Sequence, residues 1–489
     1  MENTLKVLHD LYGTKGRKAK EQILKEHSND EYLKSIFEYS MSSDVVTGIS
    51  EKSFTDILDK KEFFYTYEQE SELWKDNDFT GSKERYKNLA FFINTLSRQH
   101  NTSPSNEVIS ILSDIFSKCS PVERYWYYRI VIQNLNIDVG AVTVNNVFKG
   151  LITQYTPMLA DSGIAKFDKW VMTTNDKYCV DTKIDGLRLT IFIRSNNIKV
   201  RTRSGKYFYP LQDYFNDNLL NEPYIQKAIT GLFPEFQKDA DETKEGFVLD
   251  CEILDRDGSW ESSVSLVNVN DVELTKIDDV SGVPTEVPAF TLKCFDLINL
   301  NPFNPENFGK PTKTLDYKRR RELLEGFIKN MPDKFVFKYF DLTNMKTCDT
   351  LEEAQAIAMS YIDNGYEGAV VKHPRAFYIC GRKDSWLKIK NIQTFDGVIT
   401  EVIPGELSGK YSNMAGKLMV KCYVGDNEIT GTIGTGFTDT MRKYLWDNKE
   451  QVIGKVIEFT MLSKTVNDNF RSGVFKGFRE DKKEGTNAE

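Results

Sequence analysis

The feature that most constrains this chain is the run KIDGLR at residues 183–188, which lies between two apolar stretches. Its Asp-Gly pair is a strong turn signal and predicts two strands joined by a turn. The run also suits covalent chemistry on a nucleotide. A lysine that has lost its proton, favoured by nearby cations or desolvation, can attack an α-phosphate. Gly186 lets the backbone turn tightly beside a ligand, and Arg188 offers a planar fork for phosphate oxygens. The run alone leaves two interpretations open, a surface hairpin and a site of nucleotide attachment.

Further clusters follow this run in a defined order along the chain. They are Thr202-Arg203-Ser204-Gly205, Val248-Leu249-Asp250-Cys251-Glu252, Lys293-Cys294-Phe295-Asp296-Leu297, the spaced residues Tyr317, Arg320 and Leu324, the run GYEGAVVK at residues 365–372, Arg382, Trp386-Leu387-Lys388-Ile389-Lys390, and Arg479-Glu480-Asp481-Lys482. This ordered series resembles the motif set of the ATP-dependent DNA ligases. Within that family, the ligases of T-even bacteriophages are the nearest likeness, and the resemblance covers nearly the whole chain.

The resemblance implies a multidomain α+β fold. Residues 1–150 would form a helical DNA-binding domain, and residues 151–393 a nucleotidyltransferase domain, an ATP-grasp-like adenylation domain of antiparallel sheets and helices. Residues 394–489 would form an OB-fold β-barrel. Length agrees independently, because 489 residues suggest about three domains.

The hydrophobic periodicity changes along the chain in a way that fits these divisions. Up to about residue 150 it is helical, as in Ile23, Leu24, Leu33, Ile36 and Phe37, in Leu89, Phe92, Ile93 and Leu96, and in Val108, Ile111, Leu112 and Ile115, with a helix start at Ser103-Pro104. Short strand-like runs then dominate, at residues 187–193, 247–254 and 289–295, with helices at 317–327 and 351–362. Strands at 398–403, 418–424, 429–433 and 456–462 predict a small barrel. Polar segments 238–245 and 270–287 are interpreted as surface insertions.

Composition excludes some classes of protein. The net charge of −8 is not that of a wholly basic nucleic-acid coat, although a local basic stripe would suffice for DNA. No apolar run approaches the ~18 residues of a membrane span, and no signal peptide opens the chain, so we expect a soluble, cytoplasmic protein, in the host cytoplasm if it is phage-encoded. The seven cysteines are scattered singly, which predicts free thiols and argues against a zinc site.

Two carboxylates are candidates for the nucleotide and its metal. Glu252 and Glu367 lie at the ends of apolar strands, where they could hold Mg²⁺ against phosphates or accept a ribose hydroxyl, and a solvated strand end is the alternative. The resemblance implies that both contact nucleotide and metal, and that Thr182 and Ile184, beside the lysine, line the nucleotide site. Cys251 stands where the family usually has Gly, which affects the backbone more than the carboxylate.

Several other positions are assigned to the nucleotide by the resemblance. Phe295 would stack on adenine, although an aromatic residue in a strand is more often part of a core. Arg203, in a turn, and Arg382 are candidates for phosphate contacts. Lys388 and Lys390 alternate with apolar residues, so both ammonium groups should lie on one face of a strand, where they could hold the α-phosphate and favour the neutral amine of Lys183. Tyr317, Arg320 and Leu324 fit a helix face that supports the site.

Two glycine-containing runs look like nucleotide motifs but do not qualify. The run GELSGK at 405–410 has one residue too few for a P-loop, and Tyr411 replaces the required Ser or Thr. The run IGTGFT at 433–438 lacks the third glycine of a dinucleotide fingerprint and instead resembles a signature in the barrel of the ligase family.

The two ends of the chain carry further charged candidates. The resemblance implies that Arg479, Asp481 and Lys482 orient the departing pyrophosphate, although Gly473 and Gly477 replace a usual proline and a usual basic residue nearby, and a charged tail is the alternative. At the other end, a basic cluster at the head of a helix is suited to DNA phosphates or to solvent. Its members are Lys15, Arg17, Lys18 and Lys20.

Together these features predict a monomeric ligase that seals nicks in duplex DNA with ATP and Mg²⁺ through a lysyl-AMP intermediate on Lys183. The alternatives are an RNA ligase or an mRNA-capping guanylyltransferase, which share the K-x-D-G core. A non-enzymatic alternative is a DNA-binding scaffold with an inactive site.

Overall fold

The computed structural model describes residues 1, 3–50, 78–99, 106–153, 155–170, 175–234, 246–255, 290–304, 307–332, 339–390, 393–405, 411, 413–424, 427–461, 463–464, 470–471 and 473–482. The chain divides into two compact units. The described residues of Met1–Asp59 and Phe79–Ile389 form the first unit, and those of Lys60–Asp78 and Lys390–Glu489 form the second. The helical segment and the central sheets share the first unit, so the predicted boundary at residue 150 stays a prediction. The expected insertions at 238–245 and 270–287 lie outside the described residues.

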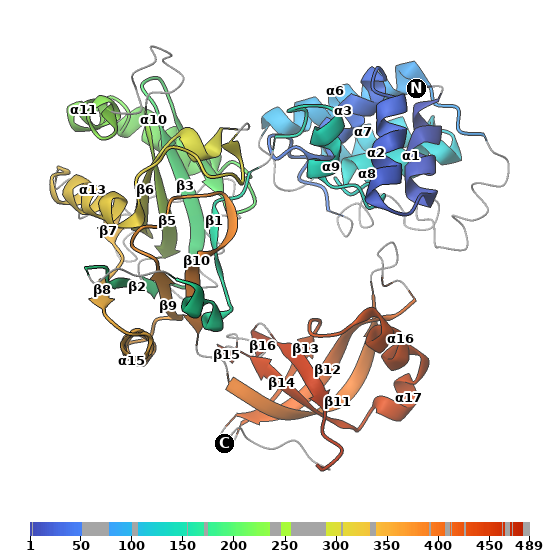
Figure 1. Ribbon diagram of the computed structural model, residues 1–489. Coiled ribbons are helices and arrows are strands. Elements are labelled where there is room, and N and C mark those ends of the chain that lie inside the picture. The colour runs from blue at the N-terminus through green and yellow to red at the C-terminus, as the bar shows by residue number, and fades with distance from the viewer. Residues whose placement is uncertain are drawn as a thin grey trace, which may run out of the picture. The chain divides into compact units, whose positions relative to one another are not determined.

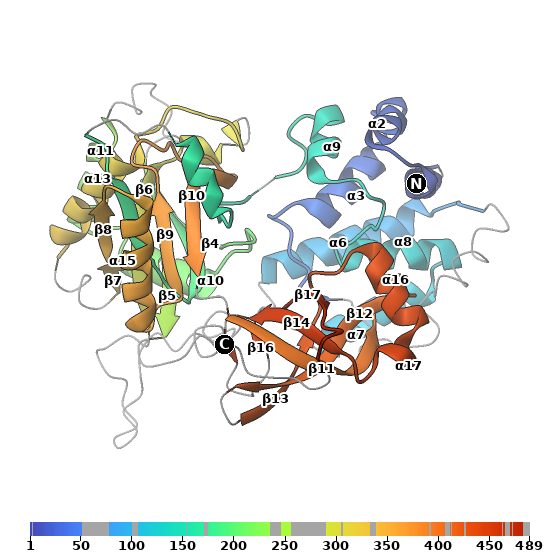
Figure 2. The same ribbon diagram turned by 60° about the horizontal axis from the view of Figure 1, so that its bottom comes forward.

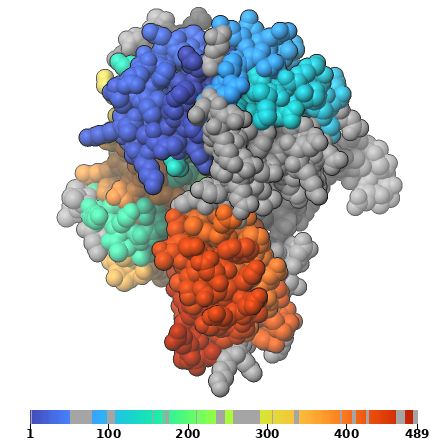
Figure 3. Space-filling view, turned by 90° about the vertical axis from the view of Figure 1, so that its right-hand side faces the viewer, coloured from blue at the N-terminus to red at the C-terminus, as the bar shows by residue number. Residues whose placement is uncertain are grey.

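The first unit begins with helices, shown in blue to cyan in Figures 1 and 3. They are α1 (Thr4–Gly13), α2 (Arg17–Glu26), α3 (Glu31–Met41), α6 (Lys83–Gln99), α7 (Asn106–Ser117), α8 (Pro121–Val131) and α9 (Ala141–Val147). The predicted apolar stripes are buried at, for example, Leu24, Phe37 and Leu89. Ile111 follows the same helical periodicity but is 41% exposed. It lies about 100° around α7 from the buried Leu112, at the edge of the apolar stripe. The expected start at Ser103-Pro104 lies outside the described residues.

Two sheets follow in the first unit (Figures 1 and 2). Sheet A has the order β1-β10-β9-β2-β8, and sheet B has the order β4-β3-β5-β6-β7. The strands are β1 (Met158–Asp161), β2 (Tyr178–Lys183), β3 (Leu187–Ile193), β4 (Ile198–Thr202), β5 (Phe247–Asp255), β6 (Phe290–Asn299), β7 (Phe340–Leu342), β8 (Met345–Cys348), β9 (Gly368–Lys372) and β10 (Gly381–Lys390). The expected sheets were antiparallel, but β1 pairs with β10 and β6 with β7 in parallel, so both sheets are mixed.

Helices cover the outer faces of these sheets and leave a shared core between them. On the outer faces lie η1 (Ile164–Lys169), α10 (Tyr209–Asn218), α11 (Pro223–Gly231), α13 (Tyr317–Lys329) and α15 (Leu351–Asp363), whereas Phe303 of η4 (Asn301–Phe303) packs in the core between the sheets. Residues of α10, α11 and α13 pack on sheet B in one apolar cluster, and residues of α15 pack on sheet A in another. A third cluster, which includes Phe295 and Trp386, contains residues of both sheets. The predicted helices at 317–327 and 351–362 are confirmed as α13 and α15.

The turn of the KIDGLR run does not join a hairpin. Strand β2, before the turn, belongs to sheet A, and β3, after it, belongs to sheet B, so residues 184–186 carry the chain from one sheet to the other. Gly186 is required at this crossing, because a Cβ atom there would lie 2.5 Å from the carbonyl oxygen of Ile253. The interpretation as a surface hairpin is therefore wrong. The Asp-Gly pair instead marks the point where the chain passes from sheet A to sheet B. Lys183 is the last residue of β2 before this crossing.

A buried ion pair ties α13 to the sheets. Arg320 donates to both carboxylate oxygens of Asp296 at 2.8 and 3.0 Å, and both side chains have no exposed surface. Arg320 also donates to the carbonyl oxygens of Leu315 and Ala376. Tyr317 and Leu324 are buried on the same helix. The predicted supporting face of this helix is thereby confirmed.

The second unit is built on a five-stranded antiparallel sheet in the order β13-β12-β11-β14-β17. Its elements are β11 (Gln393–Pro404), β12 (Ala415–Val424), β13 (Asn427–Ile433), α16 (Asp439–Asp447), α17 (Lys449–Val452), β14 (Val456–Met461), β15 (Ser463–Lys464), β16 (Phe470–Arg471) and β17 (Val474–Phe478). The four predicted strands are confirmed. No closed barrel is found among the described strands, although a parallel bridge joins Thr435 to Val474. Gly436 is needed beside it, because its φ is +92° and a Cβ there would meet the Phe475 carbonyl oxygen at 2.3 Å.

Two further observations concern the chain as a whole. Within the described ranges, no helix combines the length and the apolar character needed to cross a bilayer. All seven cysteines are buried as free thiols.

Candidate active site

Lys183 and Glu367 meet where β2 and β9 come together. The two strands are antiparallel, with Lys183 opposite Gly368, and the backbone N–H of Glu367 donates to the Lys183 carbonyl oxygen at 3.1 Å. The Lys183 ammonium donates to Glu367 Oε2. Their side chains are 22% and 10% exposed, so the amine is sheltered but still reachable from solvent. A reactive amine needs such a setting, next to a group that can accept its proton.

Arg188 is held by a carboxylate that the sequence analysis did not single out. From β3 it reaches Asp250 on β5 with two hydrogen bonds, Nε to Oδ1 at 2.8 Å and Nη2 to Oδ2 at 2.5 Å. Tyr378 donates to the same carboxylate at 2.7 Å. Although burial acts to lower the pKa of Arg188, pairing with Asp250 keeps that pKa above its ordinary value. Asp250 thus takes the Nε and Nη2 donors of the guanidinium, and the predicted phosphate contact of Arg188 stays a prediction. A charged residue inside an apolar strand was the signal that could have revealed this partner.

Glu252 lies directly opposite Arg188 on the neighbouring strand. Burial raises the pKa of its carboxyl to about 7, although Lys183 and Arg188 act in the opposite direction. A second carboxylate near Lys183 adds to this effect, because Glu367 also raises the pKa of Glu252. The pair Glu252 and Glu367 therefore concentrates negative charge around the amine, which is the setting that a divalent cation relieves.

The raised pKa of Glu252 predicts a pH dependence of stability in metal-free protein. The folded state keeps a proton on this carboxyl between about pH 4.5 and about pH 7, where the unfolded state has lost it. Its contribution to stability is therefore fully present below the unfolded pKa and is lost as the pH rises, by at most about 3 kcal/mol. We expect Glu252→Gln to gain stability relative to the parent between about pH 5 and about pH 8 in urea unfolding with EDTA. The exposed Glu352→Gln should show no such gain, and equal pH profiles for parent and Glu252→Gln would contradict the prediction.

A buried polar cluster lies beneath the site and was also missed. Lys372 on β9 donates to Asp181 Oδ2 at 2.8 Å, to the Tyr317 hydroxyl at 3.1 Å and to the Phe295 carbonyl oxygen at 3.3 Å. Burial lowers the pKa of Lys372, and Asp181 opposes this shift. Asp181 Oδ1 is buried and has no hydrogen-bond partner in the part of the chain that the structure describes. A buried acceptor without a donor is costly and marks a place where a ligand can donate.

Phe295 is 9% exposed and belongs to the core between the sheets. Two cations lie over its ring, the Arg188 guanidinium at 5.1 Å and the Lys372 ammonium at 5.0 Å, and Trp386 meets it edge-on at 6.3 Å. The ring therefore packs in the core at the level of the site. Its predicted stacking on adenine stays a prediction.

The candidates on β10 are arranged as the alternation indicated. Leu387 is fully buried and Ile389 packs in the cluster under α15, whereas Lys388 and Lys390 alternate with them and are partly exposed. In sheet A, β10 lies next to β9 and is one strand removed from β2. Arg382 donates to the Ala160 carbonyl oxygen on β1 at 2.7 Å, so this contact ties β10 to β1.

The remaining candidates in the first unit have different surroundings. Thr182 is buried and its hydroxyl accepts from the Asn344 N–H at 3.2 Å, while Ile184 is buried at the crossing between the sheets. Arg203 is exposed in the turn after β4.

The basic cluster at the start of α2 is smaller than predicted. Lys15, Arg17 and Lys18 are exposed, and Arg17 forms a salt bridge with Glu21 at 3.0 Å. Lys20 is only 3% exposed, and its ammonium donates to the Ile137 carbonyl oxygen at 2.5 Å. The assignment of Lys20 to DNA is therefore wrong, because position 20 falls on the inner face of the helix.

The three C-terminal candidates lie in the second unit, and two of them, Arg479 and Lys482, share one buried carboxylate. Asp396 on β11 accepts from Arg479 at 3.1 and 3.2 Å and from Lys482 at 2.5 Å. Arg479 also donates to both oxygens of Asp481, and these hydrogen bonds lower the pKa of Asp481 to about 2. The segment is therefore anchored to β11 and is not a frayed tail.

Comparisons with known proteins agree with this arrangement. The family described as "ATP dependent DNA ligase domain" matches residues 157–390. The DNA ligase of Enterobacteria phage T6 is 22% identical over 93% of this chain and 90% of its own length. DNA ligase 4 of Coprinopsis cinerea is 24% identical over 59% of this chain, and the match spans only 29% of that protein. A solved structure described as "Pmar-Lig_PreS3" has a TM-score of 0.69 and 20% identity, covering 97% of this chain and 99% of that one.

The paired sheets, with a lysine at the end of β2, therefore form a nucleotidyltransferase fold. Residues 157–390 match an ATP-dependent DNA ligase domain, and nearly the whole chain is similar in sequence to the DNA ligase of Enterobacteria phage T6. The resemblance inferred from the ordered motifs, including its phage branch, is confirmed.

Proposed function

We propose that this protein seals nicks in duplex DNA with ATP, through an AMP group carried on Lys183. The observation that supports this most strongly is the placement of Lys183 at the end of β2, in contact with Glu367 and with Glu252 and Arg188 nearby. The likeness to ligases along nearly the whole chain agrees with it.

The first step transfers AMP to the protein. Lys183 Nζ forms a bond to the α-phosphorus, the bond from that phosphorus to the pyrophosphate oxygen breaks, and the proton of the amine leaves towards Glu367. In the second step an oxygen of the 5′-phosphate of the nick attacks the α-phosphorus, and the phosphorus–nitrogen bond to Lys183 breaks. In the third step the 3′-hydroxyl attacks the phosphorus of the 5′-phosphate, the bond from that phosphorus to the AMP oxygen breaks, and AMP departs. Positioning and charge neutralisation do most of this work.

The residues present fit a magnesium ion. Mg²⁺ prefers oxygen ligands and is usually held by one or two carboxylates together with substrate phosphates. Glu252 and Glu367 supply such oxygens around Lys183, and the raised pKa of Glu252 is the expected mark of a carboxyl that lacks a compensating cation. The ion would neutralise charge on the phosphates. Groups of three or more His, Cys, Asp or Glu side chains suited to a metal do not occur among the described residues.

The buried Asp181 oxygen favours ATP over GTP. Through Lys372, Asp181 is linked to the backbone of Phe295, where the adenine ring is proposed to stack. Its Oδ1, to which no residue of the described ranges donates, can only accept hydrogen bonds when the carboxylate is ionised. Adenine carries an amino group at position 6, which can donate, whereas guanine carries a carbonyl there. The site therefore fits a ligase better than a capping guanylyltransferase.

DNA binding is assigned to the helical segment and to the second unit. In our proposal Lys15, Arg17 and Lys18 contact backbone phosphates of nicked duplex DNA. The second unit is proposed to be an OB fold, which its strand order and the placement of α16 and α17 between β13 and β14 support. A single parallel bridge joins Thr435, two residues beyond the end of β13, to Val474 on β17. We further propose that the chain has three domains, with boundaries at residues 150 and 393. We also propose that the protein is a monomer in the cytoplasm.

The proposal is tested by offering one nicked substrate with different nucleotides. Purified protein with Mg²⁺ and ATP should convert a nicked DNA duplex into a sealed strand and release AMP, whereas GTP or NAD in place of ATP should give no product. A parallel nick with RNA on both sides serves as the second substrate. Sealing of the RNA nick in preference to the DNA nick would assign the protein to the RNA ligases, and use of GTP would point to capping chemistry.

A further inference from the structure

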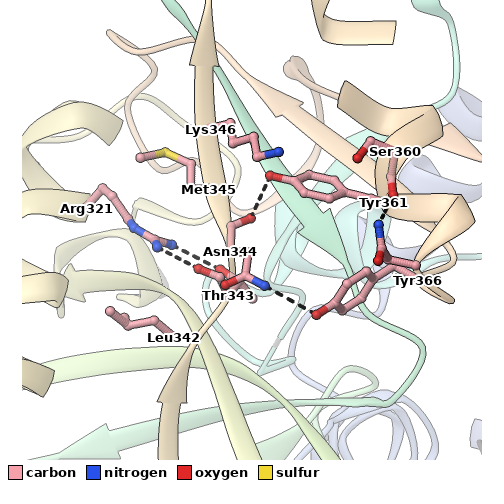
Figure 4. A pocket seen from close by; sticks show the side chains of 10 residues that line it. Arg321, Leu342, Thr343, Asn344, Met345, Lys346, Ser360, Tyr361 and Tyr366 are labelled. Atoms are coloured by element: carbon pink, nitrogen blue, oxygen red, sulfur yellow. Dashed lines mark hydrogen bonds between the residues drawn. The ribbon is translucent and has the colours of Figure 1, made fainter. Parts of the chain in front are cut away.

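An open pocket of about 650 Å³ lies beside the active site at the β8 edge of sheet A (Figure 4). It is formed by the connection from β7 to β8, the start of α13, the end of α15 and the turn before β9. The lining residues are Arg321, Leu342, Thr343, Asn344, Met345, Lys346, Ser360, Tyr361, Asn364 and Tyr366. None of these residues has a role in the proposed transfer of AMP.

The lining offers hydrogen-bond donors and positive charge, and the described residues that form it include no carboxylate. Lys346 is exposed, its ammonium lies 5.6 Å from the centre of the Tyr361 ring, and it forms no salt bridge with any residue that the structure describes. Arg321 is buried and balanced by two carboxylates, Glu325 at 2.7 Å and Asp181 at 3.7 Å. Lys346 therefore supplies the charge that is available to a ligand, and an anion is the ligand that this lining suits.

The uncharged groups of the lining suit the same kind of ligand. The Asn344 amide donates to the Tyr366 hydroxyl at 3.3 Å, and the Asn364 amide donates to the Ser360 carbonyl oxygen at 2.7 Å (Figure 4). Each of these amide groups has a second N–H to offer, and hydroxyl groups stand beside them. Asparagine, serine, tyrosine and lysine side chains are the usual partners of nucleic-acid phosphates, and a tyrosine ring can pack on a sugar or base.

The pocket is joined directly to the segment that carries Lys183. The N–H of Thr182 donates to the Asn344 carbonyl oxygen at 2.9 Å, and the Asn344 N–H donates back to the Thr182 hydroxyl. Tyr361 donates to the same Asn344 carbonyl oxygen at 3.2 Å. Thr343 precedes Asn344 in the chain. Arg321 donates hydrogen bonds to the hydroxyl and to the carbonyl oxygen of Thr343, at 3.0 and 2.7 Å. A ligand in the pocket therefore lies at the same end of β2 as the reacting amine.

A second connection runs through β9. Tyr366 immediately precedes Glu367, the residue that accepts from Lys183. The β7–β8 connection and the turn before β9, which both line the pocket, therefore end next to Lys183 and Glu367. A polynucleotide whose terminal phosphate reaches Lys183 must lay its neighbouring phosphates on adjoining surface, and the pocket is such a surface.

We propose that this pocket binds a phosphodiester group of the polynucleotide strand that flanks the reacting phosphate, with Lys346 as its charged contact. This inference rests on the proposed function and adds a site for the DNA strand to it. A free nucleotide phosphate would offer the same chemistry. The strand is favoured because Asn344, Lys346 and Asn364 are exposed, so a chain can enter and leave the pocket without being enclosed.

The test compares Lys346→Gln with Lys329→Gln, an equal change of charge at an exposed position at the end of α13. Binding of a labelled nicked duplex is measured by fluorescence anisotropy over a range of salt concentrations. Loss of one phosphate contact should weaken binding severalfold at low salt and lower the log-log salt slope by about 0.9. Lys329→Gln should match the parent. Equal slopes for the two variants would overturn the proposal.

A second measurement distinguishes binding of the polynucleotide strand from binding of a free phosphate. It also distinguishes failure of this proposal from failure of the proposed function. Inorganic phosphate and AMP are titrated against the parent and Lys346→Gln. Saturable binding of either one that is lost in the variant, with duplex binding unchanged, would reassign the pocket to a free anion and overturn our proposal. Sealing of a pre-adenylated nick should show a raised KM in Lys346→Gln. If the parent forms no lysyl-AMP but the salt slopes still differ, the pocket binds DNA and it is the proposed function that has failed.

Discussion

Replacing Lys183 by Ala is expected to abolish the transfer of label from α-labelled ATP to the protein. In the parent, ATP with Mg²⁺ should label Lys183 through an acid-labile, alkali-stable phosphoramidate, because the amine at the end of β2 is the nucleophile that forms the phosphorus–nitrogen bond. The measurement is retention of label after denaturation, followed by mapping of the labelled peptide. The loss should be complete, since neither carboxylate beside Lys183 can replace an amine in this linkage.

Lys177→Ala is the matched control, since Lys177 lies just before the same strand and is 55% exposed in a salt bridge with Asp349. It should be labelled like the parent. Label that persists in Lys183→Ala, or stronger labelling from GTP than from ATP, would overturn the assignment of the nucleophile or of the nucleotide. Glu367→Gln gives a graded result. It keeps a hydrogen-bonding partner but no base, so labelling should slow by about 100-fold and recover partly at higher pH.

The second large effect is expected from Arg479→Ala combined with Lys482→Ala in the second unit. If these cations orient the departing pyrophosphate, labelling by ATP should fall by about 100-fold or more. Sealing of a nick that already carries AMP should be largely retained, because no pyrophosphate leaves in that step. Point substitutions are needed here. A truncation before Arg471 would remove the buried Phe475 and strand β17, and would disturb the whole sheet.

Two further variants show whether the effect belongs to chemistry or to structure. Lys476→Ala removes an exposed charge from β17 and should behave like the parent. Asp396→Asn removes the carboxylate that anchors both cations. A structural role for the cations would make Asp396→Asn and the double variant lose both steps together. Normal ATP labelling in the double variant would show that this segment does not serve the first step.

Much of the local structure could be predicted from the sequence. The run at 187–193 is strand β3, the helices at 317–327 and 351–362 are α13 and α15, and the four strands expected after residue 398 are all present within a few residues. These predictions rest on the burial of alternating or 3.6-periodic apolar side chains, which is a local property of each segment. Ile111 shows the limit, because periodicity does not tell how wide the buried face of a helix is.

Partners of charged residues could not be predicted in the same way. Arg188 was expected to face phosphate, and its pairing with Asp250, which is 62 residues away in the sequence, was not expected. Lys20 was expected on a DNA-facing surface but donates to a backbone oxygen 117 residues away. Both outcomes follow from burial, since a charge taken out of water needs a partner wherever the fold brings one near.

By itself the sequence determined which residues are chemically able to act and where the strands and helices lie. The KIDGLR run identified Lys183, and the ordered series identified Glu252, Glu367 and the lysines of β10. Only the tertiary structure decided that the Asp-Gly turn crosses between two sheets and that Glu367, 184 residues from Lys183, is its partner. The physical reason is that side-chain type and periodicity are local, whereas strand pairing brings distant residues together through backbone hydrogen bonds and apolar burial that no single segment encodes.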